Sequence, residues 1–278
     1  MKKNSALIIN EKENCSNMER ICFYFFKMKN IAVSEIVSIS NVDFILLNVP
    51  KVKNKRQKLY LAQYIKKQFH YNNVIYNGNS LKWQKNENYI SYAIQYNPIS
   101  FIKKYAKLNQ VKFKQGTVIL ICDNPAQAEN FIKKICKDIY QIELYCSNIS
   151  KFEETVQYFS DNYGIFLKTM DKIGGREKND TLVISISKDE KLLRHYLSEK
   201  YLPVLNASEL RFGFSNVYED AVFVGNKEIN QLAKKYKIFN SEFLKFLAES
   251  FDCIKERKKW MEFIKKYEIK CIKLLKNN

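Results

Sequence analysis

Residues 111–239 alternate short apolar runs with segments of helical periodicity. The unbroken apolar run at 117–122 is rich in β-branched residues, which is typical of a strand buried on both faces of a parallel sheet, and residues 181–186 predict another buried strand. Between them, apolar positions of residues 126–139 recur at helical spacing, namely Ala128, Phe131, Ile132 and Ile135. This alternation predicts an α/β unit with a mainly parallel sheet.

The same segment contains signals for further elements and for their ends. The pattern predicts strands at 141–146, 165–169, 203–207 and 221–224, and helices at 151–163 and 188–201. Asp123 or Asn124 can cap the helix after the first strand, and Pro125 suits its first turn. Gly164 is expected to end a helix, because glycine readily adopts the left-handed conformation.

Residues 1–110 show the same alternation around shorter elements. Strands are expected at 5–10, 31–39, 44–49 and 73–76, and helices at 15–28 and 55–69. Helical spacing predicts that two sets of side chains face the core: Met18, Ile21, Cys22 and Phe25 in the first helix, and Leu59, Ala62, Tyr64, Ile65 and Phe69 in the second. Residues 89–109 predict a helix pair broken before Pro98, because the residue before proline avoids the helical conformation.

Residues 240–278 predict one long amphipathic helix or a helix pair. Apolar side chains form one stripe, and Lys or Arg is dense on the other faces; the stripe consists of Leu244, Leu247, Phe251, Ile254, Met261 and Ile264. We expect this helical tail to pack back on the protein, with binding to a partner or a membrane surface as the alternative.

The net charge of +18 is distributed unevenly. Residues 1–110 carry 18 basic and 6 acidic side chains, residues 111–230 carry 16 and 17, and residues 231–278 carry 13 and 6. The middle segment is therefore neutral, while both flanks are basic.

Residues 44–122 contain fourteen basic side chains and one acidic side chain, Glu87, with eight tyrosines and Trp83 among them. Such a composition suits a non-specific face for nucleic acid or another polyanion, because lysines attract phosphate and aromatic rings stack on bases. The candidate residues for that face are Lys51, Lys53, Lys55, Arg56, Lys58, Lys66 and Lys67. The alternative is a solvated basic surface whose tyrosines lie in the core.

The seven cysteines are scattered and form no CxxC pair, so we expect reduced core residues and no metal site. No signal segment and no apolar run near the length of about 18 residues that spans a bilayer are found, which predicts a cytoplasmic protein. The Gly174-Gly175-Arg176 loop is expected to be a flexible turn, with an anion-binding nest as the alternative.

Residues 116–187 resemble the cofactor domain of the shikimate dehydrogenase and glutamyl-tRNA reductase type of Rossmann protein. Residues 116–121 look like its first strand, 141–148 like its second strand and following turn, and 180–185 like its D-x-V-I-x-x strand. The resemblance covers about a quarter of the chain. It implies a Rossmann-like sheet flanked by helices and a crevice for NAD(P) at the carboxyl ends of the strands.

The turn after the first strand departs from that family. Family members place glycines there so that the backbone can approach pyrophosphate, whereas residues 122–126 contain none. Pro125 removes one N–H donor, and Asp123 adds a negative charge where phosphate would lie. Ser147 and Asn148 stand where the resemblance implies a side chain that contacts the ribose. NAD(P) is therefore a disfavoured cofactor, and the cofactor stays unknown.

Together these patterns predict an α/β protein of two lobes. The parts are a basic α/β N-terminal lobe with a helical connector (1–110), a Rossmann-like lobe (111–239), and an amphipathic basic helix or helix pair (240–278). The crevice at the carboxyl ends of the strands is expected to be lined by Cys122, Asp123, Asn124, Ser147, Asn148 and Ser185.

Three functions from different classes fit the sequence. The favoured one is a non-catalytic regulatory, scaffold or small-ligand-binding protein. The alternatives are an NAD(P)-dependent oxidoreductase with an atypical cofactor turn, and non-specific binding of nucleic acid or another polyanion through the basic N-terminal lobe. No catalytic residue is identified. A small ligand, a protein partner, nucleic acid and a second copy of the chain all stay open as partners.

Overall fold

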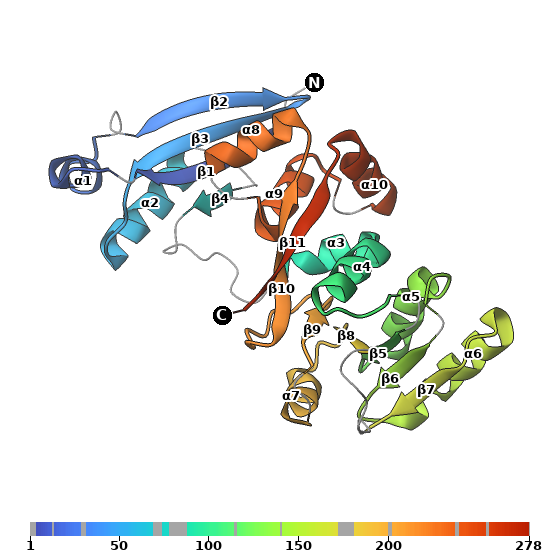
Figure 1. Ribbon diagram of the computed structural model, residues 1–278. Helices are drawn as coiled ribbons and strands as arrows, with labels where there is room; N and C mark the ends of the chain where they lie inside the picture. Colours follow the sequence, from blue (N-terminus) through green and yellow to red (C-terminus); the bar gives the residue numbers. More distant parts are fainter. Residues whose placement is uncertain are drawn as a thin grey trace. The chain divides into compact units, whose positions relative to one another are not determined.

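The chain divides into two compact units in a computed structural model (Figure 1). Unit 1 consists of residues 1–85 and 224–270, and unit 2 of residues 86–223 and 271–278. The structure describes residues 4–12, 14–28, 32–68, 74–77, 88–113, 116–139, 141–171, 181–199, 202–236, 239–253 and 256–277.

Unit 2 contains a seven-stranded sheet in the order β11-β10-β9-β8-β5-β6-β7. Its strands are β5 (Thr117–Ile121), β6 (Ile142–Tyr145), β7 (Leu167–Met170), β8 (Thr181–Ser185), β9 (Val204–Asn206), β10 (Val217–Val224) and β11 (Lys270–Lys276). All neighbouring strands between β7 and β10 in this order pair in parallel. Numbered within the unit, these six strands follow the order 3-2-1-4-5-6, which is that of the Rossmann fold.

The two central strands of this sheet are buried along their whole length. Every residue of β5 and β8 is buried, because helices cover both faces and the strands carry β-branched and other apolar side chains. Thr117 pairs with Thr181 at one end and Ile121 with Ser185 at the other. The sequence prediction of a mainly parallel α/β sheet is confirmed.

Helices alternate with these strands along the chain. They are α3 (Ile90–Tyr96), α4 (Pro98–Leu108), α5 (Pro125–Ile135), α6 (Glu153–Tyr163) and α7 (Glu190–Glu199), with a 3₁₀ turn at Ile149–Phe152. The chain leaves β5 towards β6 through α5, and leaves β8 in the opposite direction towards β9 through α7. Right-handed crossovers in opposite directions place α5 and α7 on opposite faces of the sheet. The α7 side chains Leu193 and Tyr196 accordingly share a core with Ile121 and Val183.

Several helix ends form as the sequence predicts. The Asn124 side chain caps α5 by accepting a hydrogen bond from the backbone N–H of Gln127, and Pro125 occupies the first turn. Gly164 ends α6 with a φ of 61°. The helix pair broken at Pro98 is observed as α3 and α4.

Unit 1 contains a four-stranded sheet in the order β2-β3-β1-β4. Its elements are β1 (Asn4–Lys12), α1 (Asn17–Tyr24), β2 (Val33–Ile39), β3 (Val42–Pro50), α2 (Lys55–Gln68), β4 (Val74–Asn77), α8 (Lys227–Tyr236), α9 (Ser241–Ser250) and α10 (Arg257–Lys266). β1 pairs in parallel with β3 and β4, while β2 is an antiparallel edge strand. One side of the sheet packs on α1 and α2 through a cluster that includes Leu7, Phe23 and Leu61.

The boundaries of the two compact units differ from those of the three parts expected from sequence. Residues 86–110 belong to unit 2, and most of the expected tail belongs to unit 1, because long-range strand pairing and packing join segments that are distant in sequence. The tail is not wholly helical: it forms α9 and α10 and then β11, which adds an edge to the sheet of unit 2.

The predicted core face of α1 is wrong: Met18, Ile21 and Phe25 are exposed, whereas Phe23 and Tyr24 of the same segment are buried. The predicted core face of α2 is confirmed in part, because Ile65 is buried and Tyr64 packs on the core, whereas Leu59 is 62% exposed. Phe69 and the Gly174-Gly175-Arg176 loop lie outside the described residues. Among the helices that the structure describes, none has the length and apolar character to cross a bilayer.

Candidate functional site

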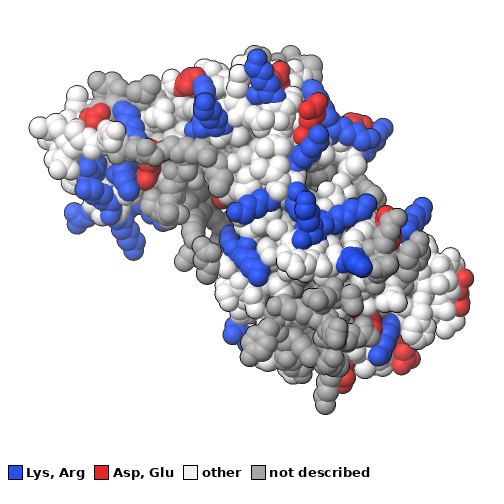
Figure 2. Space-filling view, in the orientation of Figure 1, with Lys and Arg blue, Asp and Glu red and all other residues white. Residues whose placement is uncertain are grey.

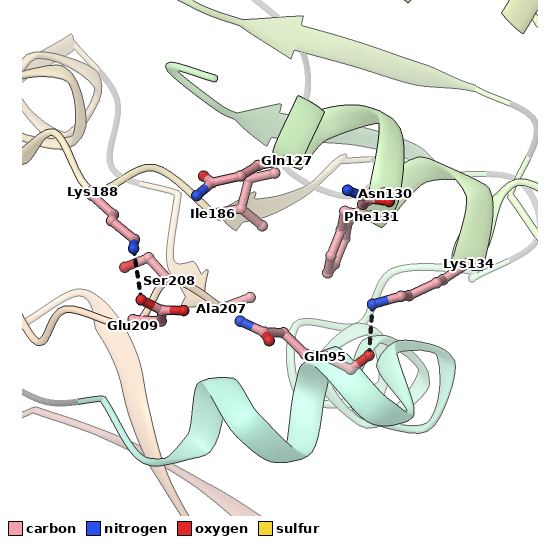
Figure 3. Close-up of a pocket in the computed structure, with 10 residues that line it drawn as sticks. All are labelled: Gln95, Gln127, Asn130, Phe131, Lys134, Ile186, Lys188, Ala207, Ser208 and Glu209. Carbon is pink, nitrogen blue, oxygen red and sulfur yellow. Dashed lines mark hydrogen bonds and ion pairs between the residues drawn. The ribbon is translucent and has the colours of Figure 1, made fainter. Parts of the chain in front are cut away.

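A pocket of about 300 Å³ lies in unit 2 at the carboxyl edge of its sheet (Figure 3). Ile186 and Lys188 follow β8, Ala207 and Glu209 follow β9, and Gln127 lies in the first turn of the helix that follows β5. The pocket therefore lies where the chain leaves β5 in one direction and β8 in the other. This reversal is the topological switch point, at which open α/β sheets bind ligands.

The pocket wall on the side of α5 is a polar stripe with an aromatic centre. Gln127, Asn130, Phe131 and Lys134 share one face of α5, because they are spaced three, four and seven residues apart. Figure 3 shows Phe131 pointing into the space and Gln95 reaching towards it from α3. Phe131 is only 4% exposed, so its ring forms the apolar base of the pocket. The amide side chains of Gln127 and Asn130 lie beside it.

Two lysines and one carboxylate complete the lining. The Lys134 ammonium donates to the backbone oxygen of Gln95 at 3.0 Å, which ties α5 to α3. Lys188 forms an ion pair with Glu209 at 2.6 Å. These two side chains are 46% and 52% exposed, so the pair is worth less than about 1 kcal/mol and can exchange for a ligand group.

A buried hydrogen-bond network holds the part of the pocket wall that is formed by the residues after β9. The fully buried Asn88 donates from its side chain to the backbone oxygens of Asn206 and Ser208, at 2.8 and 2.9 Å, and its N–H donates to the oxygen of Glu209. The Asn206 side chain in turn donates to the Glu219 carboxylate at 2.8 Å. These bonds fix the backbone that carries the pocket residues from Ala207 to Glu209.

Glu219 is the centre of this network, and its side chain is fully buried. Besides Asn206, it accepts hydrogen bonds from the N–H groups of Phe212 and Gly213 and from the side chain of Asn277. Gly213 has a φ of 75°, a conformation that glycine adopts without strain. The carboxylate thus folds the loop after β9 into a fixed turn beside the pocket.

The six crevice residues expected from sequence lie outside the lining of this pocket. Cys122 is buried, its thiol donates to the oxygen of Asn124 at 3.0 Å, and burial raises its pKa to about 12. The side-chain oxygen of Asn124 is used by the cap of α5. Among the described residues, the Oδ1 atom of Asp123 is buried with no hydrogen-bond partner. A dinucleotide turn would instead offer free N–H groups here.

The other three expected residues are separated from the pocket. Ser147 and Asn148 are exposed after β6, and Asn148 accepts a hydrogen bond from Ser150 at 2.7 Å. Ser185 is fully buried, and strand alternation puts it on the same face as Val183, opposite the face that α5 covers. The role of these six residues in a crevice stays a prediction.

Sequence reasoning missed the residues that line the pocket. One signal was present: Gln127, Asn130 and Lys134 form a polar stripe on α5 one turn after the predicted crevice. The contributions of α3 and of the loop after β9 depend on packing between distant segments, and no local pattern marks them.

The basic residues expected to bind polyanions lie in unit 1, where Lys51 and Lys53 follow β3 and the other five belong to α2. Lys51, Lys53, Lys55 and Arg56 are exposed, and Lys58 is half-buried. Lys66 and Lys67 belong to α2, but their side chains lie outside the described part of the structure.

Two solved structures are weakly similar to this chain. The Δ1-pyrroline-2-carboxylate reductase of Thermococcus litoralis, solved with NADH and L-proline, matches with 18% identity and a TM-score of 0.24. The match covers 35% of this chain and only 30% of the reductase. A shikimate 5-dehydrogenase-like protein matches with 9% identity and a TM-score of 0.28, over 73% of this chain and 77% of that protein.

No protein-family model and no curated protein sequence matches the chain. The strand order and the parallel pairing of β5 to β10 are what define the fold of unit 2. Unit 2 is a Rossmann-like α/β unit.

Proposed function

We propose that unit 2 binds a small polar ligand, smaller than a dinucleotide, in the pocket at the switch point, and that its role is binding and not catalysis. The observation that carries this proposal is the position of the pocket, which lies at the carboxyl edge of β5, β8 and β9 in a Rossmann-like sheet. In such sheets this is the place at which ligands bind.

The lining supports a ligand with one flat or apolar part and several hydrogen-bonding groups. Phe131 and Ile186 offer apolar contact, while Gln95, Gln127 and Asn130 offer amide donors and acceptors. Lys134 and Lys188 can each meet a carboxylate of the ligand. A compact carboxylate or a nucleobase-like heterocycle fits this chemistry.

The size of the pocket and the turn before α5 support a ligand smaller than NAD(P). A volume of about 300 Å³ is at the lower end of ordinary ligand sites. At the start of α5, Pro125 has no N–H, and the N–H of Gln127 is bound by the Asn124 side chain. Pyrophosphate would need free backbone N–H donors at both of these positions.

Thermal unfolding with a panel of small molecules tests the proposal. Suitable probes are succinate, L-glutamate, nicotinamide and adenosine, each at about 100 times a Kd near 50 μM, at which a one-site ligand stabilises by about 2.7 kcal/mol. We expect at least one probe class to raise the unfolding temperature.

A matched pair of variants on α5 locates the binding site. Asn130→Trp places a large ring in the pocket and should abolish the stabilisation. Ala126→Trp adds the same ring at an exposed position of α5 outside the lining and should leave it unchanged. A stabilising probe that binds Asn130→Trp as well as the parent chain would contradict the proposal, as would a panel with no effect.

An NAD(P)-dependent oxidoreductase is the second candidate, and the strand order favours it. The 3-2-1-4-5-6 order of unit 2 is the order of sheets that bind dinucleotides. Saturable binding of NADH or NADPH, followed by oxidation of the cofactor with an added carbonyl substrate, would support this candidate over the first.

A further inference from the structure

Helix α1 of unit 1 and the four residues that follow it carry an exposed group of large apolar side chains. The Ser16 side chain accepts a hydrogen bond from the N–H of Glu19 at 3.1 Å, and the Glu19 carboxylate accepts one from the N–H of Ser16, so a full capping box starts the helix. The exposed residues, here called the apolar tip, are Met18 (68%), Ile21 (43%), Phe25 (62%), Phe26 (70%) and Met28 (44%).

The apolar tip is not the face that holds α1 on the protein. Phe23 and Tyr24 do this: the Phe23 ring makes edge contacts with Tyr60 and Tyr64 of α2 at 5.5 and 5.4 Å between centroids. The Tyr24 hydroxyl donates to the backbone oxygen of Pro50 at 2.6 Å. Because packing already uses the opposite face, the five exposed side chains are left for contact with something outside the chain.

A run of basic residues adjoins α1 at this point. Residues 51–58, here called the basic run, contain five basic side chains and no acid: Lys51, Lys53, Lys55, Arg56 and Lys58. The hydrogen bond from Tyr24 to Pro50 holds the start of the run beside α1, and the ring of Tyr60 holds its end. Figure 2 shows Lys and Arg side chains gathered over α2, beside a mostly uncharged surface with one acidic patch where Figure 1 draws α1.

Two nearby acids, Glu11 and Glu19, offset only part of the charge of the five basic residues in the basic run. Glu19 belongs to the capping box and lies 3.8 Å from the Lys12 ammonium. The Glu11 carboxylate accepts hydrogen bonds from the N–H of Val52 at 3.0 Å and from the hydroxyl of Tyr76 at 2.5 Å. The surface therefore combines an apolar tip with positive charge at its side.

We propose that the apolar tip and the basic run form a peripheral binding surface for an anionic phospholipid bilayer. Phenylalanine, methionine and isoleucine side chains would enter the boundary between headgroups and acyl chains, while the basic run would lie against anionic headgroups. Charge complementarity favours this occupant. A second copy of the chain would bring a second basic run against the first, and nucleic acid would use the charge but not the aliphatic side chains of Met18 and Ile21.

Flotation of the full chain with lipid vesicles tests the proposal. We expect binding to phosphatidylcholine vesicles that contain phosphatidylglycerol at about 30%, and at least about tenfold weaker binding to phosphatidylcholine alone, since each basic residue near an anionic surface adds about fivefold. Phe25→Ser with Phe26→Ser should weaken binding by at least about tenfold. Lys53→Gln with Lys55→Gln and Arg56→Gln should do the same at about 0.1 M salt.

Matched controls come from unit 2. Phe166→Ser removes one exposed phenylalanine (80% exposed), and Lys137→Gln with Lys151→Gln and Lys168→Gln removes three exposed charges. Both control variants should bind vesicles like the parent chain. An unchanged unfolding temperature in every variant shows that loss of binding is not loss of folding.

Four results would overturn the proposal. The first is no binding to the anionic vesicles, and the second is equal binding by the Phe25 and Phe26 double variant. The third is a dimer in sedimentation that this double variant dissociates, which would assign the tip to a second copy. The fourth is preferential binding of a single-stranded oligonucleotide that depends on the basic run alone, which would assign the surface to nucleic acid.

Discussion

The two sheets of this chain are built from the same alternation of strands and helices, yet their polar and exposed apolar side chains lie in different positions. In unit 2, β5 and β8 are buried on both faces, and polar side chains collect at the carboxyl edge of the sheet. In unit 1, β2 is a mostly exposed edge strand, and α1 turns apolar side chains outward. The first arrangement favours a pocket, and the second favours an exposed binding surface.

The difference lies in the outer elements, because residues 6–10 of β1 in unit 1 are buried much as β5 and β8 are in unit 2. When both faces are covered, only the ends of the strands remain for ligand contacts, and these ends must be fixed by buried hydrogen bonds such as those of Glu219. When an element is held by one face alone, as α1 is by Phe23 and Tyr24, its other face is free for an external partner.

The largest expected effect contrasts two phenylalanines two residues apart. Phe23 is fully buried, so Phe23→Ala should lower the free energy of unfolding by about 4 kcal/mol. Phe25 is 62% exposed, so Phe25→Ala should change it by less than about 0.5 kcal/mol. Urea denaturation of both variants measures the contrast, and equal losses would show that α1 packs in another way.

The next largest effect on the free energy of unfolding concerns the hydrogen bonds of Glu219 beside the pocket. Glu219→Ala takes the acceptor from four donors, the buried Asn206 side chain and three partly buried groups, and should lower the free energy of unfolding by about 3 kcal/mol. Glu209→Ala removes only an exposed ion pair and should cost less than about 1 kcal/mol. Urea denaturation compares the two, and a small loss for Glu219→Ala would mean that the loop after β9 does not depend on this carboxylate.

Local features of unit 2 could be predicted from sequence because they depend on neighbouring residues. The buried runs that became β5 and β8, the Asn124 cap with Pro125 and the Gly164 helix end each have a signature within a few residues. These features, placed in order along the chain, were enough to indicate a Rossmann-like sheet.

Features that depend on distant segments could not be predicted. The helical spacing of α1 favours Met18 and Ile21 for the core, but tertiary packing of Phe23 on α2 buries another face of the helix. β11 follows two helices and becomes a strand because β10 offers an edge to pair with. The pocket combines α3, α5 and two loops, so its lining was known only once the sheet was built.

A smaller effect concerns the turn that distinguishes unit 2 from a dinucleotide site. Asn124→Ala removes the side-chain cap of α5 and should lower the free energy of unfolding by about 1 kcal/mol. Asn148→Ala, in the exposed turn after β6, should cost less than about 0.5 kcal/mol. Equal losses in urea would indicate that Asn124 does not hold the helix start.

The smallest effect is a pH dependence from Cys122. Burial raises the pKa of the folded thiol to about 12, whereas the unfolded thiol ionises near its ordinary value of 9.0. The unfolded state therefore loses its proton first, so stability falls as pH rises from 9 towards 12. Between pH 8 and pH 9.5 this thiol should remove about 0.8 kcal/mol.

Cys122→Ala isolates this contribution. The variant should lose less stability over that pH interval than the parent chain, whatever its stability at pH 8. The free energy of unfolding in urea, measured at both pH values, gives the two slopes. Identical slopes would mean that Cys122 ionises as readily in the folded protein as in the unfolded one.

In the function proposed for unit 2, the turn from Cys122 to Ala126 leaves a pocket for a small ligand and no place for pyrophosphate. Titration of the full chain with NADH and NADPH, followed by cofactor fluorescence, distinguishes this function from dinucleotide binding. We expect no saturable binding up to about 1 mM, which corresponds to less than about 4 kcal/mol of binding free energy. Saturation well below that concentration, weakened by a substitution in this turn, would contradict it.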